Sequence, residues 1–167
     1  MIRTASIAFA TLLIAGAAFA AAVPGDLGFD SDEPIAVNAD SFSADLQSET
    51  GTYTGNVLVV QGAIRLRADE VTVAAPEGRA TRMEARGGIV VESPSGTATG
   101  AAAVYDIPGQ IVRLTGNVVL TNDANVMRGD VLEVRIADGR ATLSGGVSGN
   151  GQGRVQGLFV SPAGEEN

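Results

Sequence analysis

The chain has 167 residues, no cysteine and no histidine, and all of its basic residues are arginine. The absence of these side chains excludes the usual zinc ligand sets, Ser-His-Asp and Cys-His catalysis, and a disulfide framework. The net charge of −8 is opposite to the basic surface that nucleic-acid binding requires, so no nucleic-acid partner is expected.

The first twenty residues have the features of a secretory signal peptide. Arg3 supplies a positive start, residues 7–19 form an apolar run, and Ala18-Phe19-Ala20 matches the small-x-small cleavage pattern. The run is shorter than the roughly 20 residues that span a bilayer. We therefore expect cleavage after Ala20, or alternatively after Ala22, and export of the mature chain.

The residues that follow the signal divide into a leader, a domain and a tail. Residues 21–33 are rich in glycine and acidic residues without a period and are expected to be a flexible leader, and residues 163–167 a disordered tail. Apolar and polar residues alternate over 42–47 and 64–69, and this period of two predicts strands. Because helical spacing extends over no useful length, residues 34–162 are predicted to form one all-β domain.

A repeated phrase runs through this domain. Aligning residues 53–73 with 114–134 gives identical residues at 8 of 21 positions, including the four residues that begin at Thr54 and at Thr115. Glycine followed by Asn or Gly, and then by Val or Ile, recurs at spacings of 32, 29 and 29 residues: Gly55, Gly87, Gly116 and Gly145. Repetition at this period indicates supersecondary units that stack on one another.

The Gly-Asn phrase has a mechanical interpretation. Glycine adopts positive φ without steric cost and asparagine tolerates it, so the pair can form a bulge or corner between two β runs. Apolar residues fall on even numbers over 64–68 and on odd numbers over 71–73. A strand keeps its parity, so we expect a corner near Asp69-Glu70 and an equivalent one at Asp130.

Carboxylate pairs are the remaining candidates for catalysis. Asp69 with Glu70, or Asp130 with Glu133, could act as in glycoside hydrolases. Acids that alternate with apolar residues are typical of the exposed face of a strand, so we expect no enzyme. Calcium needs several oxygen ligands close together. Residues 122–125 are predicted to form a hairpin turn instead, and no metal or cofactor is expected.

The apolar face of the predicted strands contains few aromatic side chains. The folded region has Phe42, Tyr53, Tyr105 and Phe159, and the other inward positions are Val, Ile, Leu or Ala. Such a face forms either a closed core of small residues or an apolar trough that accepts acyl chains. The pattern leaves both open.

Five segments form a series: PIAVNAD at 34–40, YTGNVLVVQGAIRLRADEVTV at 53–73, Gly-x-x-x-x-Tyr-Asp at 100–106, LTGNVVLTNDANVMRGDVLEV at 114–134 and RVQGLFVSP at 154–162. The series resembles the LptA, or OstA-like, family of periplasmic lipopolysaccharide-transport proteins over nearly the whole mature chain. The cleavable signal and the absence of a barrel favour this type over the LptC and LptD relatives. The resemblance implies a single open, twisted β-jellyroll of about sixteen short antiparallel strands.

The same resemblance implies a function in outer-membrane assembly. The interior carries the acyl chains of lipopolysaccharide, without a cofactor, and copies stack head to tail across the periplasm. The stack bridges an LptC-like inner-membrane partner and an LptD-like outer-membrane translocon. The positions that match the family's lipid contacts are in the first strand, near residue 89, and after an expected turn at Gly100: Ile35, Val37, Ile89, Tyr105 and Ile107.

The ends of the sheet are the expected sites of assembly. Unpaired strands are predicted at 35–40 and at 154–160, and an unpaired edge is a template for another chain. The second end is unusually apolar and contains Val155, Leu158, Phe159 and Val160. The alternative function is a secreted structural or adhesive β-solenoid without a lipid ligand, and a third is a carbohydrate-active enzyme on a β-helical frame.

Overall fold

The structure is a computed structural model that describes residues 33–122, 125–145, 147–148 and 151–159. The expected signal peptide, most of the leader, and the tail lie outside these residues. The main sheet has ten strands, all paired antiparallel. They are β1 (Ala36–Asn38), β2 (Ser41–Asp45), β3 (Thr50–Gln61), β4 (Ile64–Ala74), β5 (Arg82–Ser93), β6 (Gly96–Asp106), β7 (Ile111–Asn122), β8 (Asn125–Arg135), β9 (Arg140–Ser144) and β12 (Gln156–Leu158).

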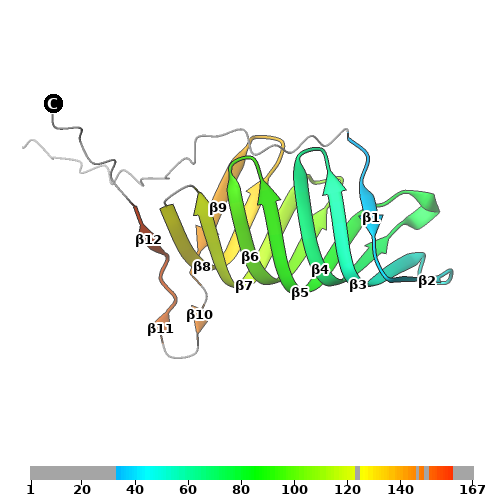
Figure 1. The fold of residues 1–167 in the computed structure, drawn as a ribbon, viewed down its shortest axis with the longest axis horizontal. Coiled ribbons are helices and arrows are strands. Elements are labelled where there is room, and N and C mark those ends of the chain that lie inside the picture. Colours follow the sequence, from blue (N-terminus) through cyan, green and yellow to red (C-terminus); the bar gives the residue numbers. More distant parts are fainter. Residues whose placement is uncertain (1–32, 123–124, 146, 149–150, 160–167) are drawn as a thin grey trace, which may run out of the picture.

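Two small elements complete the fold. A single 3₁₀ turn, η1 (Pro76–Gly78), lies between β4 and β5. The strands β10 (Val147–Ser148) and β11 (Gly151–Gln152) form a separate hairpin, which projects from one end of the main sheet (Figure 1). In the described part of the chain, no helix has the length and apolar character needed to cross a membrane.

The strand order is that of a meander. Strands β3 to β8 are neighbours in chain order, with β1 and β2 beside β3, and β9 and β12 beside β8. Short hairpins impose this order, and the two Greek keys that define a jellyroll are not found among the described strands. The count of about sixteen strands is likewise not confirmed, because the six strands of 11 or 12 residues continue through their bends.

The bends lie at three glycines of the predicted repeat, each followed by Asn or Gly. In β3 the φ angles are +84° at Gly55 and +45° at Asn56, and these two residues stand opposite the single residue Asp69 of β4. The same pair of positive φ angles occurs in β5 at residues 87–88 and in β7 at residues 116–117. The corner interpretation is therefore confirmed, with two left-handed residues in each bulge. The parity change is confirmed as well, since Ala68 and Val71 are both buried.

The corners divide the sheet into two halves that face each other, each with eight antiparallel segments. Half-sheet A consists of β1, residues 57–61, 64–68, 89–93, 96–100, 118–122, 125–129, and β12. Half-sheet B consists of β2, residues 50–54, 70–74, 82–86, 102–106, 111–115, 131–135, and β9.

The core lies along the inside of the bend. The most deeply buried large side chains are all within two residues of a corner: Val57, Val71, Ile89, Leu114 and Val118. The outer face of half-sheet B is polar instead, with ion pairs between strands such as Arg113 with Glu133 at 2.9 Å. Because polar and apolar side chains alternate, the inner faces of both halves are left apolar.

The fourth repeat does not make a fourth corner. Its first residue, Gly145, directly follows the end of β9 at Ser144, and the chain then enters the β10–β11 hairpin. The chain returns to the sheet only at β12, which pairs with β8 at residues 126–128. The expected turn at Gly100 is also absent, because Gly100 lies within β6 beside the bend and contacts Leu114 closely. The repeat thus ends where the sheet ends.

Candidate functional site

An apolar cavity of about 70 Å³ lies between the two half-sheets. Both halves contribute to its lining, which is apolar apart from Gln61 and the Tyr105 hydroxyl. Half-sheet A provides Val59, Gln61, Ile64, Leu66 and Val91, and half-sheet B provides Val71, Met83, Ala85, Ala103, Val104, Tyr105 and Val112. The volume is roughly half that of a protein cavity that admits benzene, about 150 Å³. An alkyl chain therefore enters only if the half-sheets separate.

The predicted lipid-contacting residues lie in three settings around this cavity. Ile35 precedes β1 and Val37 lies within it, and both are partly buried against the core at one end of half-sheet A. Ile107, just after β6, is partly buried on the opposite rim, and its backbone N–H donates to the Thr81 carbonyl at 3.1 Å. These three side chains are accessible at the margin of the interior. Their contact with a lipid stays a prediction.

Ile89 and Tyr105 differ in their access to the interior. Ile89 directly follows the corner in β5 and is only 1 % exposed, so it forms part of the floor of the bend. Tyr105 lines the cavity directly and is partly buried. Burial raises the pKa of the Tyr105 hydroxyl above its ordinary value, while a hydrogen bond from the Gln61 side chain acts to lower it. The hydroxyl is therefore neutral near pH 7.

Gln61 is a residue of the cavity that the sequence reasoning did not identify. Its odd number, shared with the buried Val57 and Val59, places it on the inner face of β3 and is the signal that could have identified it. Its side chain is 8 % exposed, and its Nε2 donates to the Glu33 carbonyl at 3.1 Å. Gln61 thus brings a polar group to an otherwise apolar interior.

Glu133 and Asp69, one from each carboxylate pair considered for catalysis, lie in different surroundings. Glu133 lies on the outer face of β8, where a hydrogen bond from Arg113 and the charge of Arg135 hold its pKa below the usual range. Asp69 lies at the bend against Gly87, the residue whose missing side chain leaves room for it. Among the described residues, no three Asp, Glu, His or Cys side chains form a group able to hold a metal ion.

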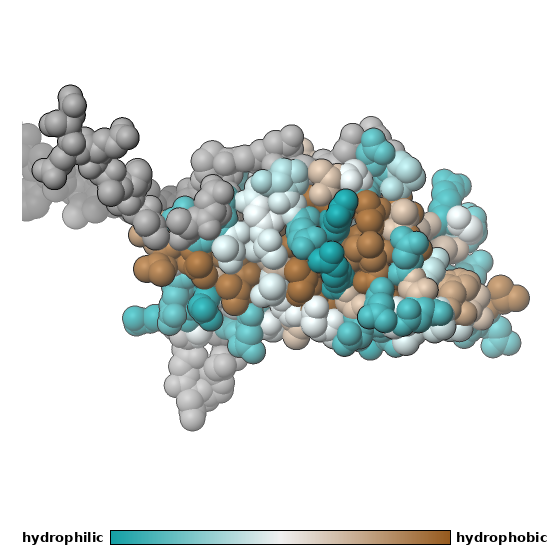
Figure 2. All heavy atoms as spheres, in the orientation of Figure 1, coloured by the Kyte–Doolittle hydropathy of each residue, from teal (hydrophilic) through white to brown (hydrophobic). Residues whose placement is uncertain are grey.

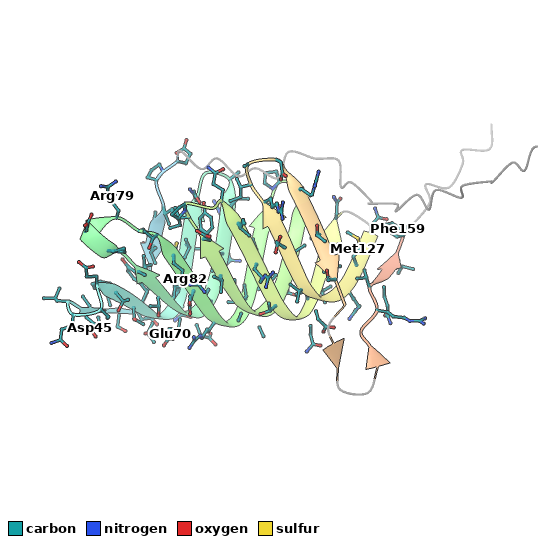
Figure 3. All side chains as sticks on the ribbon, turned by 180° about the vertical axis from the view of Figure 1, so that it is seen from behind. Asp45, Glu70, Arg79, Arg82, Met127 and Phe159 are labelled. Atoms are coloured by element: carbon teal, nitrogen blue, oxygen red, sulfur yellow. The ribbon has the colours of Figure 1, made fainter. Side chains whose placement is uncertain are left out.

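Among the described strands, the two ends of the sheet are formed by edge strands of matching length, each paired on one side only. At one end β1 has three residues and β2 has five, and at the other end β12 has three and β9 has five. β1 and β12 belong to half-sheet A, whereas β2 and β9 belong to half-sheet B. Figure 3 shows the ends far apart, with Asp45 of β2 at one and Phe159 beyond β12 at the other.

Exposed apolar side chains are found at both ends. Beyond β9, the chain exposes Val155 by 45 %, Leu158 by 65 % and Phe159 by 68 %, whereas Val160 lies outside the described residues. At the opposite end, Phe42 is 57 % and Leu46 88 % exposed beside an open hollow of about 370 Å³. Figure 2 shows apolar side chains at the β12 end, on the left of the view.

Comparison with known proteins agrees with this architecture. The family model described as "LptA/(LptD N-terminal domain) LPS transport protein" matches residues 36–140. The chain belongs to this family. The matched residues begin at β1 and end at the first residue of β9, so they include all six bent strands and their corners.

Individual relatives in the family are similar over most of their length. The lipopolysaccharide export system protein LptA of Escherichia coli K12 is 32 % identical over 134 residues, which cover 71 % of this chain and 69 % of that protein. LptA of Haemophilus influenzae is 26 % identical over 140 residues, 78 % of this chain and 79 % of that protein. The identification as an OstA-like chain is thereby confirmed.

A solved structure shares the fold. LptH of Pseudomonas aeruginosa, described as the LptA homologous periplasmic component of a lipopolysaccharide transport device, aligns with a TM-score of 0.69 at 19 % identity. The alignment covers 79 % of this chain and 99 % of that chain. The open, bent antiparallel sheet is therefore the architecture that this family member has in common with LptH.

Proposed function

We propose that this protein carries lipopolysaccharide through the periplasm, with the acyl chains between half-sheets A and B. The observation that carries the proposal is the apolar cavity lined by both halves, in a chain that belongs to a lipopolysaccharide transport family. The lining is apolar apart from Gln61 and the Tyr105 hydroxyl, so it suits hydrocarbon. Ile35, Val37, Tyr105 and Ile107 contact the acyl chains from the rim, and Ile89 contacts them from the floor once the halves separate.

We further propose that copies of the chain stack head to tail and so bridge the inner and outer membranes. Each half-sheet has eight antiparallel segments, so its first and last strands run in opposite directions. When one copy follows another, β12 meets β1 and β9 meets β2, and both contacts are antiparallel. Strand addition at two edges of equal length supplies main-chain hydrogen bonds in both halves.

The free ends of such a stack meet the membrane complexes. The β1–β2 end offers its edge to an LptC-like inner-membrane partner, and the β9–β12 end offers its edge to an LptD-like outer-membrane translocon. Both partners are proposed to dock by the same strand addition, because the ends of the stack present the same edges as its internal junctions. Val155, Leu158, Phe159 and Val160 add apolar contact at the second end.

The lipid arm of the proposal is tested with Ile107→Asp. A carboxylate on the rim of an apolar interior costs several kcal/mol when lipid excludes water from it, so the variant is expected to lose co-elution with purified lipopolysaccharide. Thr99→Asp is the matched control, because residue 99 alternates with the buried Ala98 and points to the outer face of β6.

Three outcomes of this experiment are informative. Loss of lipid in Ile107→Asp with retention in Thr99→Asp supports an acyl-binding interior. Equal loss in both variants refutes the assignment of the interior as the lipid site. Assembly of the wild-type chain without any co-eluting lipopolysaccharide would instead favour the alternative, a structural rod that has no lipid ligand.

A further inference from the structure

Among the described residues, the inner faces of the half-sheets contain one buried polar side chain. Within the described part of the chain, every buried side chain is apolar except that of Gln61. Burying an amide is unfavourable unless its hydrogen-bonding groups are satisfied. A polar group in an interior that otherwise suits hydrocarbon therefore needs an explanation.

Gln61 is satisfied by contacts that connect three parts of the molecule. Its Nε2 donates to the Glu33 carbonyl, in the segment before β1, and its side chain is hydrogen-bonded to the Tyr105 hydroxyl. Gln61 ends β3 in half-sheet A, whereas Tyr105 lies near the end of β6 in half-sheet B. Strands β3 and β6 are not neighbours in the sheet. The contact therefore crosses the interior, at the rim remote from the corners.

This contact cannot persist when a chain lies between the half-sheets. The cavity of about 70 Å³ is too small for an alkyl chain, so the rims must move apart. The hydrogen bond between Gln61 and Tyr105 is then broken, and the hydrocarbon of the bound chain keeps water away from both side chains. A buried donor or acceptor left unsatisfied is costly, and a ligand that restores the hydrogen bond avoids that cost.

We propose that Gln61 and Tyr105 select acyl chains with a hydroxyl group close to the head end, an inference that rests on the proposed acyl-binding function. The polar head of the ligand remains in solvent, so the rim meets the first carbons of the chain and the corner meets its tail. A hydroxyl group accepts from the Tyr105 hydroxyl or the Gln61 amide and donates to the Gln61 carbonyl. It replaces the contact that loading removes, which an unsubstituted chain cannot do.

The test compares three acids of equal length: tetradecanoic acid, 3-hydroxytetradecanoic acid and 12-hydroxytetradecanoic acid. Dissociation constants are measured by displacement of a fluorescent apolar dye from the full-length mature chain. We expect the 3-hydroxy acid to bind roughly fivefold to tenfold more tightly than tetradecanoic acid, the contribution of about one hydrogen bond. The 12-hydroxy acid is expected to bind more weakly than both, because its hydroxyl group reaches the apolar floor.

Two variants assign this preference to the pair. Tyr105→Phe removes one oxygen atom, and Gln61→Met keeps the approximate shape of the side chain without its amide. Each is expected to bring the ratio of the two dissociation constants close to one. Thr99→Val, on the outer face, is the control and is expected to keep the wild-type ratio.

The results separate this inference from the function on which it rests. Binding of tetradecanoic and 3-hydroxytetradecanoic acid with the same ratio in the wild type and in both variants overturns the selectivity but leaves the acyl-binding interior intact. Absence of binding by all three acids overturns the acyl-binding interior, and the selectivity with it. Circular dichroism of each variant confirms that the sheet has formed.

Discussion

The close approach of two strands at the third corner leads to a quantitative prediction. Gly116 has φ of +86°, and a Cβ added there would lie 2.6 Å from the Cβ of Ala101 on the neighbouring strand β6. Gly116→Ala therefore meets two penalties, one from the backbone conformation and one from the overlap. Gly139 has φ of +63° with nothing within 4 Å of an added Cβ. Gly139→Ala meets the first penalty alone.

The magnitudes follow from these two geometries. A non-glycine residue in the left-handed region costs about 1–2 kcal/mol, and overpacking an ordered contact costs about 1–3 kcal/mol more. We expect Gly139→Ala to lower the free energy of unfolding by about 1–2 kcal/mol and Gly116→Ala by about 2–5 kcal/mol. For a domain of this size, each kcal/mol lowers the Tm by roughly 4 °C.

A second substitution isolates the overlap. Ala101→Gly removes the methyl group that the new side chain would contact, and by itself costs about 0.5–1 kcal/mol because glycine is unfavourable within a strand. In the double variant the overlap is absent, so its cost is expected to be about 1–3 kcal/mol smaller than the sum of the two single costs. Urea unfolding of the four proteins, followed by circular dichroism, measures this coupling.

Two results would refute the reasoning. If Gly116→Ala costs no more than Gly139→Ala, the approach to Ala101 has no energetic consequence. If the double variant is additive within about 0.5 kcal/mol, the cost of Gly116→Ala arises elsewhere than from this contact. Either result would remove the physical reason for glycine at the third corner beyond its φ angle.

The remaining predictions concern the first corner, the sheet edge and acid stability. Asn56→Ala and Asn56→Gly both lose the hydrogen bond from Asn56 Nδ2 to Asp40 Oδ2 at 2.7 Å. Because residue 56 has φ of +45°, which glycine adopts freely, Asn56→Ala should cost about 1 kcal/mol more than Asn56→Gly in urea unfolding. A chain truncated after Gly151 loses β12 and should fold and bind lipid but sediment as a monomer at concentrations where the full chain associates, and unchanged association would contradict the edge assignment. Arg82 holds the pKa of Glu84 below its usual 4.5, and Arg113 does the same for Glu133. The two ionised carboxylates therefore stabilise the fold above pH 4.5, and this stabilisation is lost as the pH falls through their lowered pKa values. A variant that combines Glu84→Gln with Glu133→Gln should accordingly lose less stability than the wild type when the pH is lowered from about 5 to about 3.

The sequence alone determined those features that depend on local backbone preference. Alternation with a period of two is a property of each strand, and the positive φ of Gly-Asn is a property of two adjacent residues. The all-β class, the repeat and the corners at Gly55 and Gly116 could therefore be predicted. The change of parity on either side of Asp69 was sufficient to place a bend in β4 before any pairing was known.

The number of strands and the end of the repeat depended on pairing partners. Six strands continue through their bends because both of their halves find a neighbour in the same order. At Gly145 the repeat is present in the sequence, but no further long strand follows among the described residues, and the chain leaves the sheet. Local sequence does not distinguish a bend from a strand end, since the difference lies in what is hydrogen-bonded beside it.

The interior of the molecule was decided by the tertiary structure. Gln61 and Tyr105 are 44 residues apart in the chain and lie on strands that are not neighbours, so no periodicity or motif connects them. The closeness of Ala101 to Gly116 and the size of the cavity likewise follow from the twist of the sheet and from how tightly the half-sheets close. Strand alternation determines which side chains point inward, and only the distance between the two inner faces determines which of them touch.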